Sequence, residues 1–584
     1  MKKIKERMGH IMRIDEIQIE KFRTFKKCNI RLNDINAIVG ENNSGKTAIL
    51  KALNAFFHFE EESNNFVSHA HQYTKSANTK IQITFSDIPS KVFYDDKKTG
   101  DKLIVKMQYI YSKQRRTLTY IVNGTEMSCD DSFVQEIKKD IDYIYIPASR
   151  NNYDLKWKDD SVFKNLVEEY TKEYTTSRDM ISKHVKSASE KLHKSVLNKI
   201  ETQLEQLFPL DTKMIFSIGY AKDVDYSLLL ENLVVALNES GKEYPITEYG
   251  SGIKSLTVIS MYRILASMTG RNIILGIEEP EMNLHPQMQK QFISAMKQGK
   301  TNNEVQLLMA SHSTVIIDEL NYDDIILVRR EPDIKRGFTS IVTQLSLDFW
   351  NQNKEKFKYH QFFDYRNSDF YFSKYIIITE SKTDAQVVEQ LISNELGNKM
   401  SYVSIINLDG IKNLEYPFYL LKELKLPFSC VVDRDFFTEY LNGELDKSRD
   451  LITGFPKYKS EIVDSDLIKE ILPTVEEREK LREAFDSGIY KNVYECLEKH
   501  KFYCMQYCLE MDMVCSSKIC EKYYDLLNMT PDKHNAYNLL IEKKKAIKKI
   551  EYILTALDEV PLISYPISLK KIKRGLIDDV NEYV

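Results

Sequence analysis

The sequence has little glycine and proline and no long uninterrupted apolar run: its 584 residues include 19 Gly and 14 Pro. With 42% apolar and 29% charged residues, this scarcity of helix breakers is typical of an ordered globular protein and excludes a collagen-like or disordered chain. No stretch approaches the roughly 20 apolar residues that cross a bilayer. The basic segment Met1–Met12 also lacks the apolar core of a signal peptide. We therefore expect a cytoplasmic protein with no membrane partner.

A strong net charge of either sign is also missing. The 82 Lys and Arg residues against 86 Asp and Glu residues give a net charge of −4, which provides no chain-wide attraction to nucleic acid. Any DNA binding has to come from local clusters of cations. Two such clusters lie near the end of the sequence, at Lys543–Lys549 and Lys570–Arg574. Each could contact phosphates, and the alternative for each is a solvated helix face.

The eight cysteines lack the paired C-x2-C spacing of structural zinc sites. In a long chain without a secretion signal we expect reduced thiols and not disulfides. Five of them crowd one segment around His500: Cys496, Cys504, Cys508, Cys515 and Cys520. We favour buried helical thiols over a zinc site for this group.

The length predicts two to four domains, with two main modules as the working expectation. Strand-like apolar runs alternate with helical segments, which predicts an α/β protein with parallel sheets. These runs are Ile273–Ile277, Val305–Met309, Tyr375–Thr379, Tyr402–Leu408 and Ser429–Val432. Residues 159–208 contain no Gly or Pro and predict long helices, which we assign to an inserted dimerisation arm over about residues 155–215.

An aromatic segment, Phe349–Phe372, separates the two modules. Its rings could stack on bases, but packing between domains is the interpretation we favour. We therefore expect domains over residues 1–365 and 366–584, the second with a helical C-terminal part.

The first motif is a glycine loop, Gly40–Thr47, which fits G-x-x-x-x-G-K-[ST] in full. It lies between a strand-like run ending in "NAIVG" and an expected helix at Thr47–Phe57, and we expect two strands to lead into it. In such a loop the backbone N–H groups cradle phosphates, Lys46 reaches the β and γ phosphates and the Thr47 hydroxyl binds Mg²⁺. The candidate nucleotide-binding residues here are Gly40, Asn42, Asn43, Gly45, Lys46 and Thr47.

Three further features follow in order along the chain. Ser251 and Gly252, in "YGSGIKSL", predict a helix N-terminus that offers amide groups to a γ-phosphate. The buried run Ile273–Ile277 ends in Glu278, a candidate Mg²⁺ ligand, and Glu279, a candidate for polarising water. His312, after the next strand, is placed to contact the γ-phosphate.

This order of P-loop, signature, acidic strand end and histidine resembles an ABC-type ATPase head of the RecF and SMC families. The resemblance implies ATP as a cofactor. It also implies a homodimer or homotetramer, because in these families the signature of one head completes the site of another. The segment "EEPEMNLHP", Glu278–Pro286, resembles the ATPases of the OLD (overcoming lysogenization defect) family.

A second group of acids follows two later strands. Glu380 ends the run Tyr375–Thr379, Asp384 comes four residues later, and Asp433 and Asp435 follow the run that ends at Val432. Carboxylates at the carboxyl ends of neighbouring parallel strands converge on one edge of a sheet. Such oxygen ligands suit Mg²⁺ or Mn²⁺.

The pattern resembles a Toprim domain, with Glu380 as its glutamate and Asp433 and Asp435 as its DxD motif. The residue after the Toprim glutamate is usually Gly, and here it is Ser381. An ABC ATPase followed by Toprim resembles the OLD-family nucleases, including the Gabija nuclease subunit and effectors of some retrons. The resemblance implies a further acidic element, with Glu510 and Asp512 as candidates, and a catalytic lysine, for which we favour Lys543, Lys544 or Lys545.

The resemblance predicts metal-dependent cleavage of DNA in antiphage defence, with a reverse transcriptase and its small DNA or a helicase-like protein as possible partners. Toprim chemistry also serves topoisomerases and primases, but no separate domain carrying a nucleophilic tyrosine is apparent in the sequence. A third alternative is a RecF- or SMC-like DNA repair ATPase or scaffold in which the acid cluster is inactive.

Overall fold

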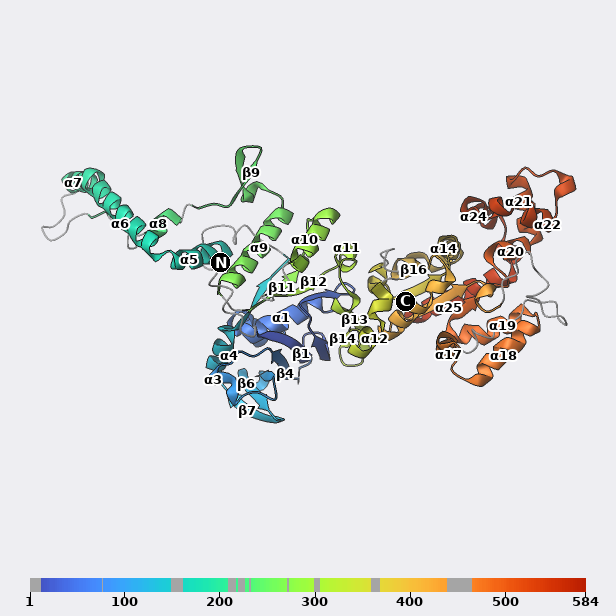
Figure 1. Cartoon of the computed structure of the whole chain (residues 1–584), viewed down its shortest axis with the longest axis horizontal. Coiled ribbons are helices and arrows are strands. Elements are labelled where there is room, and N and C mark those ends of the chain that lie inside the picture. The colour runs from blue at the N-terminus through green and yellow to red at the C-terminus, as the bar shows by residue number, and fades with distance from the viewer. Residues whose placement is uncertain are drawn as a thin grey trace. The chain divides into compact units, whose positions relative to one another are not determined.

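A computed structural model describes residues 12–75, 77–148, 161–207, 217–218, 226–230, 233–269, 272–298, 305–358, 368–438 and 465–584. The chain divides into two compact units, Met1–Val342 and Thr343–Val584. The expected boundary at residues 365 and 366 lies outside the described residues. Figure 1 shows both units.

The first unit is built on a sheet of 12 strands among the described residues, in the order β7-β6-β5-β4-β1-β2-β14-β13-β3-β12-β11-β8. In chain order the strands are β1 (Arg13–Phe22), β2 (Phe25–Arg31), β3 (Ile35–Val39), β4 (Thr79–Ser86), β5 (Leu103–Ile110), β6 (Arg115–Val122), β7 (Thr125–Cys129), β8 (Ile141–Ile146), β11 (Asn272–Glu278), β12 (Val305–Ala310), β13 (Ile325–Asp333) and β14 (Gly337–Thr343). The strands β8, β11, β12, β3 and β13 pair in parallel, whereas β1, β2 and β4–β7 pair antiparallel.

The parallel part of this sheet explains the apolar runs in the sequence. Every residue of β3 is buried, and so is every residue of β11 except the last. Parallel strands covered on both faces have this continuous apolar character. Helix α1 (Lys46–Phe57) buries ten of its twelve residues, which confirms the helix expected after the glycine loop. Three strands, β1 to β3, precede the loop, so the expectation of two was wrong; the turn between Phe22 and Phe25 divides the first run.

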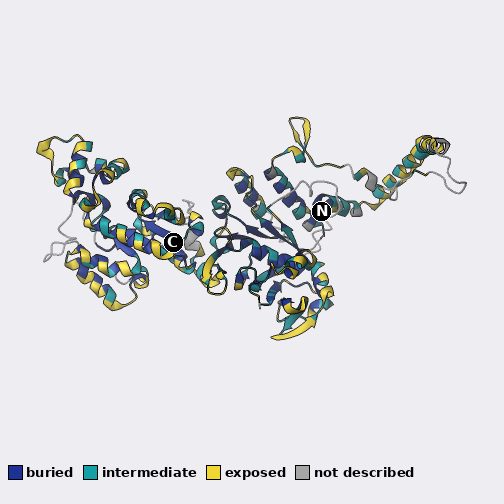
Figure 2. Cartoon of the chain, turned by 180° about the vertical axis from the view of Figure 1, so that it is seen from behind, coloured by how far each residue is buried: buried dark blue, intermediate teal, exposed yellow. Residues whose placement is uncertain are grey.

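The expected helical arm is present as α5 (Val162–Glu173), α6 (Thr175–Leu192) and α7 (Asn198–Leu207). A single π-helical turn, His193–Leu197, joins the last two. Helix α5 packs on α9 (Ser251–Thr269) through a small apolar core that includes Leu166 and Met261. By contrast, no residue of α6 is buried, and Figure 2 shows the exposed surface of this segment. The expected arm continues to residue 215, beyond the described part.

The second unit has a parallel sheet in the order β16-β15-β17-β18. Its strands are β15 (Tyr375–Thr379), β16 (Val403–Asn407), β17 (Phe428–Val432) and β18 (Phe502–Cys504). The helices of this unit include α14 (Lys382–Leu396), α15 (Glu415–Glu423), α17 (Asp466–Ile471), α18 (Val475–Asp486), α19 (Tyr490–Leu497), α20 (Leu509–Val514), α21 (Ser517–Leu526), α22 (Ala536–Ile541), α23 (Lys544–Ile547), α24 (Ile550–Glu559) and α25 (Ile567–Tyr583). The α/β class, the parallel strands and the helical C-terminal part are therefore confirmed.

Helix α25 is anchored to this sheet by a buried polar contact. The Asp579 carboxylate accepts hydrogen bonds from the Ser429 hydroxyl (2.6 Å) and from the Tyr503 hydroxyl (2.8 Å). Because a buried carboxylate without partners would be costly, these bonds fix the register of the helix on β17 and β18.

Two expectations for this unit need correction or completion. Cys504 lies in β18, Cys508 precedes α20, and Cys515 is exposed, so the expectation of a group of buried helical thiols was only partly right.

In the aromatic segment, Phe370 and Tyr371 are buried and stacked with their ring centroids 4.3 Å apart, which makes them unavailable to bases. In the part of the chain that the structure describes, no helix is long and apolar enough to cross a membrane.

Candidate functional site

The glycine loop joins β3 to α1, and its geometry requires glycine. Gly40 has a φ of +138°, and a Cβ atom there would lie 2.0 Å from the Val328 carbonyl oxygen. Gly45 has a φ of +113°, with similarly close neighbours. L side chains rarely adopt either backbone conformation, so a substitution at either position would be strained. The two expected loop residues Asn42 and Asn43 are exposed, and Asn43 has a φ of +60°.

Lys46 is folded back onto this loop. Its ammonium group donates to the carbonyl oxygens of Gly40 (2.9 Å) and Glu41 (2.7 Å). Burial lowers the pKa of Lys46 to about 8, and the nearby carboxylates of Glu279 and Glu281 act in the opposite direction. The Ser44 hydroxyl is buried and has no hydrogen-bond partner. Thr47, half-buried, lies in the first turn of α1.

The acidic end of β11 lies against this loop. The Glu278 carboxylate accepts a hydrogen bond from the Ala148 N–H group (3.3 Å) and from the Tyr145 hydroxyl. Glu279 has a φ of +42°, and its N–H group donates to the Ala310 carbonyl at 2.8 Å. The chain therefore turns sharply after β11, and this turn brings the Glu279 charge close enough to act on Lys46.

The loop after β12 that contains Ser311 and His312, here called the histidine loop, is held by Glu281, a carboxylate that the sequence did not single out. Glu281 accepts hydrogen bonds from the His312 N–H group (2.6 Å) and the Ser311 hydroxyl (3.0 Å). Burial, together with the nearby charge of Lys46, lowers the pKa of His312 to about 4, so the imidazole is neutral near pH 7. The segment "EEPEMNLHP" was the only signal for Glu281, and it did not separate this residue from its acidic neighbours.

The expected signature begins a helix, since α9 starts at Ser251. A Cβ atom on Gly252 would lie 2.7 Å from the Asn283 carbonyl oxygen and 2.7 Å from the Leu284 side chain. Glycine at this position therefore lets α9 pack on the turn that follows Glu279. The P-loop, the acidic strand end, the signature helix and the histidine loop lie in the same unit.

In the second unit, three carboxylates converge at the ends of two neighbouring strands. Glu380 follows β15, and Asp433 and Asp435 follow β17, its parallel partner. One oxygen from each lies within 4.8 Å of the others. Burial and the charges of Asp435 and Asp384 raise the pKa of Glu380 to about 7, and burial with the neighbouring acids raises the pKa of Asp433 well above its usual range.

This trio fits a divalent metal ion. Glu380 Oε2 is buried without a hydrogen-bond partner, and the donors are all carboxylate oxygens. Hard cations such as Mg²⁺ and Mn²⁺ prefer such ligands, and their charge would relieve the repulsion that raises the pKa of Glu380. The trio is the metal-compatible group found among the described residues.

Asp384 faces the start of α14 and makes a capping box with Ser381. Its carboxylate accepts from the Ser381 N–H group (3.0 Å) and hydroxyl (2.7 Å), and its own N–H group donates to the Ser381 hydroxyl (3.2 Å). Ser381 has an extended backbone, with φ at −130°, which accepts any side chain. This turn therefore does not need the conformational freedom of glycine, and the Ser381 side chain caps the N-terminus of α14.

The two candidate acids on α20 point to different partners. Glu510 lies close enough to Glu380, Asp384 and Asp433 to act on their charges. Asp512 is fully buried and accepts hydrogen bonds from the N–H groups of Gln506 (2.8 Å) and Tyr507 (2.9 Å) and from the Ser568 hydroxyl (2.5 Å). The structure therefore brings Glu510 to the acids, while Asp512 secures the turn after β18.

A lysine from the expected basic run meets this acid. The Lys548 ammonium lies 3.0 Å from the Glu510 carboxylate. Burial acts to raise the pKa of Glu510, but hydrogen bonds, the first of them from Lys548, and the charge of Lys548 together lower that pKa. Of the three favoured lysines, Lys543 is the N-cap of α23, Lys545 is exposed, and the side chain of Lys544 lies outside the described part.

Comparisons with known proteins agree with these two sites. A sequence profile described as "AAA ATPase domain" matches residues 12–214 and 97–317, which together span more than half of the chain. A second profile, "Overcoming lysogenization defect protein-like, TOPRIM domain", matches residues 371–435, which contain Glu380, Asp433 and Asp435. The chain belongs to the OLD family.

Curated relatives of this OLD-family chain cover most of both sequences. The OLD nuclease of Thermus scotoductus is 21% identical over 461 residues, covering 72% of this chain and 82% of the relative. Endonuclease GajA of Bacillus cereus is 22% identical over 514 residues, covering 72% and 73%. Among solved structures, the Smc head domain of Pyrococcus furiosus bound to the C-terminal domain of ScpA matches 59% of this chain and 100% of its own, at 16% identity and a TM-score of 0.35.

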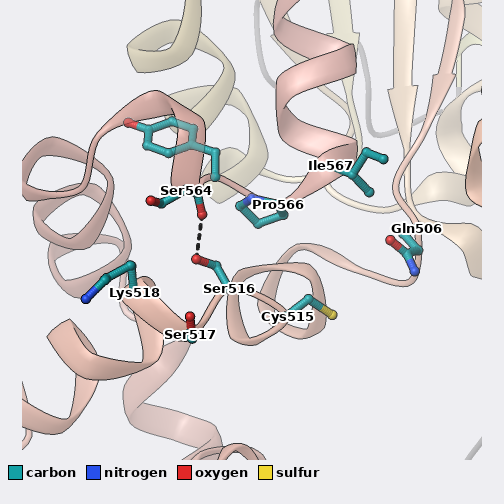
Figure 3. A pocket seen from close by; sticks show the side chains of 9 residues that line it. Gln506, Cys515, Ser516, Ser517, Lys518, Ser564, Pro566 and Ile567 are labelled. Carbon is teal, nitrogen blue, oxygen red and sulfur yellow. Dashed lines mark hydrogen bonds between the residues drawn. The ribbon is translucent and has the colours of Figure 1, made fainter.

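The OLD-family chain also has a pocket of about 410 Å³ in its helical C-terminal part. Its lining comes from the start of α21 and the loop before α25, together with Gln506 and Cys515. Figure 3 shows the Ser516 hydroxyl bonded to the Ser564 carbonyl (2.5 Å) across it. Since Gln506 also donates to Asp512, this pocket borders the turn that Asp512 secures.

Proposed function

We propose that this OLD-family chain is an ATP-binding, metal-dependent DNA endonuclease. One observation carries the proposal: carboxylate oxygens of Glu380, Asp433 and Asp435 lie within 4.8 Å of one another, with one Glu380 oxygen buried and unpaired. Curated relatives named as nucleases support it. DNA is therefore the proposed substrate. Mg²⁺ or Mn²⁺ is the proposed cofactor of these three carboxylates, which we call the acid centre.

Each residue of the centre has a distinct role in this proposal. Glu380, Asp433 and Asp435 would hold divalent cations, and Asp384 and Glu510 would add negative charge beside them. Bound there, two cations supply an activated water and charge stabilisation of the leaving oxygen. Lys548 pairs with Glu510 beside these carboxylates, and its ammonium would balance the charge of a phosphate bound there.

In the ATPase head, Lys46, Thr47 and Glu278 would bind ATP and its magnesium ion. Glu279 would polarise water, and His312, neutral near pH 7, would accept or donate a hydrogen bond at the γ-phosphate. A second copy of the chain would supply Ser251 and Gly252 to this site. A dimer or tetramer, assembled in part through the arm, would then couple nucleotide state to DNA cleavage.

Cleavage of supercoiled plasmid tests the proposal. The full chain should nick or linearise the plasmid with Mn²⁺ or Mg²⁺ and lose this activity in chelator. Asp433→Ala should lose it at any metal concentration, while Asp466→Asn, which removes a carboxylate that is 91% exposed, should cleave normally. Cleavage that survives Asp433→Ala would refute the acid centre. No cleavage by the unaltered chain with any metal, with or without ATP, would favour a DNA-binding ATPase or scaffold.

We extend the proposal to antiphage defence, with either a reverse transcriptase and its small DNA or a helicase-like protein as partner. Cells carrying the gene with its neighbours should resist phage, and Asp433→Ala should remove this resistance. A neighbouring reverse transcriptase gene would identify a retron, and a helicase gene a Gabija-type system. Equal plaque numbers with and without the intact gene, over a range of phages, would refute the defensive role.

A further inference from the structure

The residue between the two aspartates of the acid centre is a buried arginine. Arg434 is 7% exposed. Its guanidinium lies over the ring of Phe485, 5.2 Å from the centroid, and over the ring of Tyr507, 5.9 Å from the centroid. Its Nη1 donates a hydrogen bond to the Gln506 carbonyl oxygen at 3.4 Å. The side chain is therefore held between α18, which carries Phe485, and the turn after β18.

The backbone of Arg434 is held as well. Its N–H group donates to the Tyr507 carbonyl oxygen at 2.8 Å. Its own carbonyl oxygen accepts hydrogen bonds from the N–H groups of Phe437 (3.0 Å) and Thr438 (3.1 Å) and from the Thr438 hydroxyl (3.1 Å). Because each aspartate of the pair is one peptide bond away, contacts that fix Arg434 also restrict both carboxylates.

The turn after β18 is bound by opposite charges. Arg434 donates to the carbonyl oxygen of Gln506, and the Asp512 carboxylate accepts from the N–H groups of Gln506 (2.8 Å) and Tyr507 (2.9 Å). Asp512 and Glu510 both belong to α20. The turn therefore connects the loop that carries the two aspartates to the helix that carries Glu510.

The charge of Arg434 is not explained by packing alone. Burying a charged group costs free energy that an apolar side chain of similar volume avoids. A methionine would also pack against Phe485, which is 3% exposed, but it could not donate to the Gln506 carbonyl. The packing role and the hydrogen-bonding role of this side chain can therefore be separated by substitution.

We propose that Arg434 is a positioning residue of the acid centre. By binding the turn after β18, it holds the two neighbouring aspartates where they can share a metal ion with Glu380, and it fixes their place relative to Glu510. Supporting groups of this kind orient the ligands of metal sites. The inference rests on the proposed metal centre, but it does not require that DNA is the substrate.

Calorimetric titration of the full chain with Mn²⁺, in the absence of DNA, tests this role. Arg434→Met should bind Mn²⁺ more weakly, on the order of tenfold to a hundredfold, the range that supporting groups of metal sites reach. Arg434→Lys should lie between this variant and the unaltered chain. Its ammonium keeps a donor for the Gln506 carbonyl but lacks the planar group that stacks on the two rings.

Arg478→Met is the matched control. Arg478 is also a buried arginine, 9% exposed, and its guanidinium donates to the carbonyl oxygens of Leu472 (2.7 Å) and Pro473 (3.1 Å). It lies on α18, the helix that carries Phe485. Arg478→Met should therefore lower the Tm, as the loss of a buried donor does, but keep the Mn²⁺ affinity of the unaltered chain.

Unchanged Mn²⁺ affinity in Arg434→Met would overturn the proposal. An equal loss of affinity in Arg478→Met would also overturn it, because the effect would then come from the stability of α18. If Arg434→Met does not fold, Arg434→Lys decides: weaker Mn²⁺ binding supports the role, and unchanged binding overturns it. The proposed function fails separately, since a chain that shows the Arg434 effect on Mn²⁺ but never cleaves DNA would refute the nuclease and keep the positioning role.

Discussion

The Lys548 ammonium lies 3.0 Å from the Glu510 carboxylate, so a cation from the C-terminal basic run reaches the acid centre on the edge of the parallel sheet. The two residues are 38 positions apart and belong to different helical segments, α20 and the end of α23. This pair places positive charge next to the carboxylates that face a metal ion. It also separates Lys548 from its neighbours in the same run.

Replacing Lys548 by Gln should therefore reduce DNA cleavage by about 10²- to 10³-fold, the usual cost of removing one group that stabilises transition-state charge. Single-turnover cleavage rates measure this effect, and Mn²⁺ affinity should be retained. Lys545→Gln is the matched control, because Lys545 is exposed in the same run. The assignment is wrong if Lys543→Gln or Lys545→Gln loses activity while Lys548→Gln cleaves normally.

The pKa of Glu380 predicts how the metal-free protein responds to pH. Burial and the charges of Asp435 and Asp384 raise it from 4.5 to about 7. The folded chain then holds a proton that the unfolded chain has released, so the free energy of unfolding falls as pH rises from about 4.5 to about 7.

Glu380→Gln cannot ionise at this position. In chelator at pH 8 its Tm should exceed that of the unaltered chain by about 2–4 °C, while added Mn²⁺ should stabilise it far less. Thermal unfolding with and without metal measures both effects. A lower Tm than the unaltered chain in chelator would contradict this prediction.

Glu281 should matter for ATP hydrolysis more than for ATP binding. It accepts hydrogen bonds from the His312 N–H group and the Ser311 hydroxyl, and bonds to a charged acceptor contribute about 1.5–3 kcal/mol each. Glu281→Ala should release the histidine loop and lower kcat for ATP, with nucleotide affinity largely kept because Lys46 remains. Glu281→Gln keeps one acceptor, so its kcat for ATP should lie between that of the unaltered chain and that of Glu281→Ala. Loss of ATP binding in Glu281→Ala would instead give this residue a direct role at the nucleotide.

Ser381 should contribute to stability through its capping box with Asp384. Ser381→Ala removes the acceptor for the Asp384 N–H group and should lower the free energy of unfolding by about 1 kcal/mol. Ser381→Gly, the residue usual in the Toprim pattern, should cost only a few tenths of a kcal/mol. Urea unfolding of the three proteins checks the order, and equal stability of the alanine and unaltered proteins would show that the cap contributes nothing.

Contiguous motifs could be predicted from the sequence because their geometry is local. The glycine loop has positive φ at Gly40 and Gly45, a local backbone conformation that glycine adopts without strain. Glu380 and Asp433 could also be predicted, since each directly follows a continuous apolar run and parallel strands end at one edge. The ATPase and Toprim modules followed from these short segments.

Tertiary structure decided which side chains complete the sites. Glu510 and Asp512 are two residues apart and equally acidic in the sequence, yet one faces the acid centre and the other bonds to the turn at Gln506. Five of the seven residues of the basic run Lys543–Lys549 are lysines, and their pattern contains no periodicity that selects Lys548. Only the tertiary fold brings Lys548 to Glu510, because this ion pair joins segments whose relative placement no local spacing encodes.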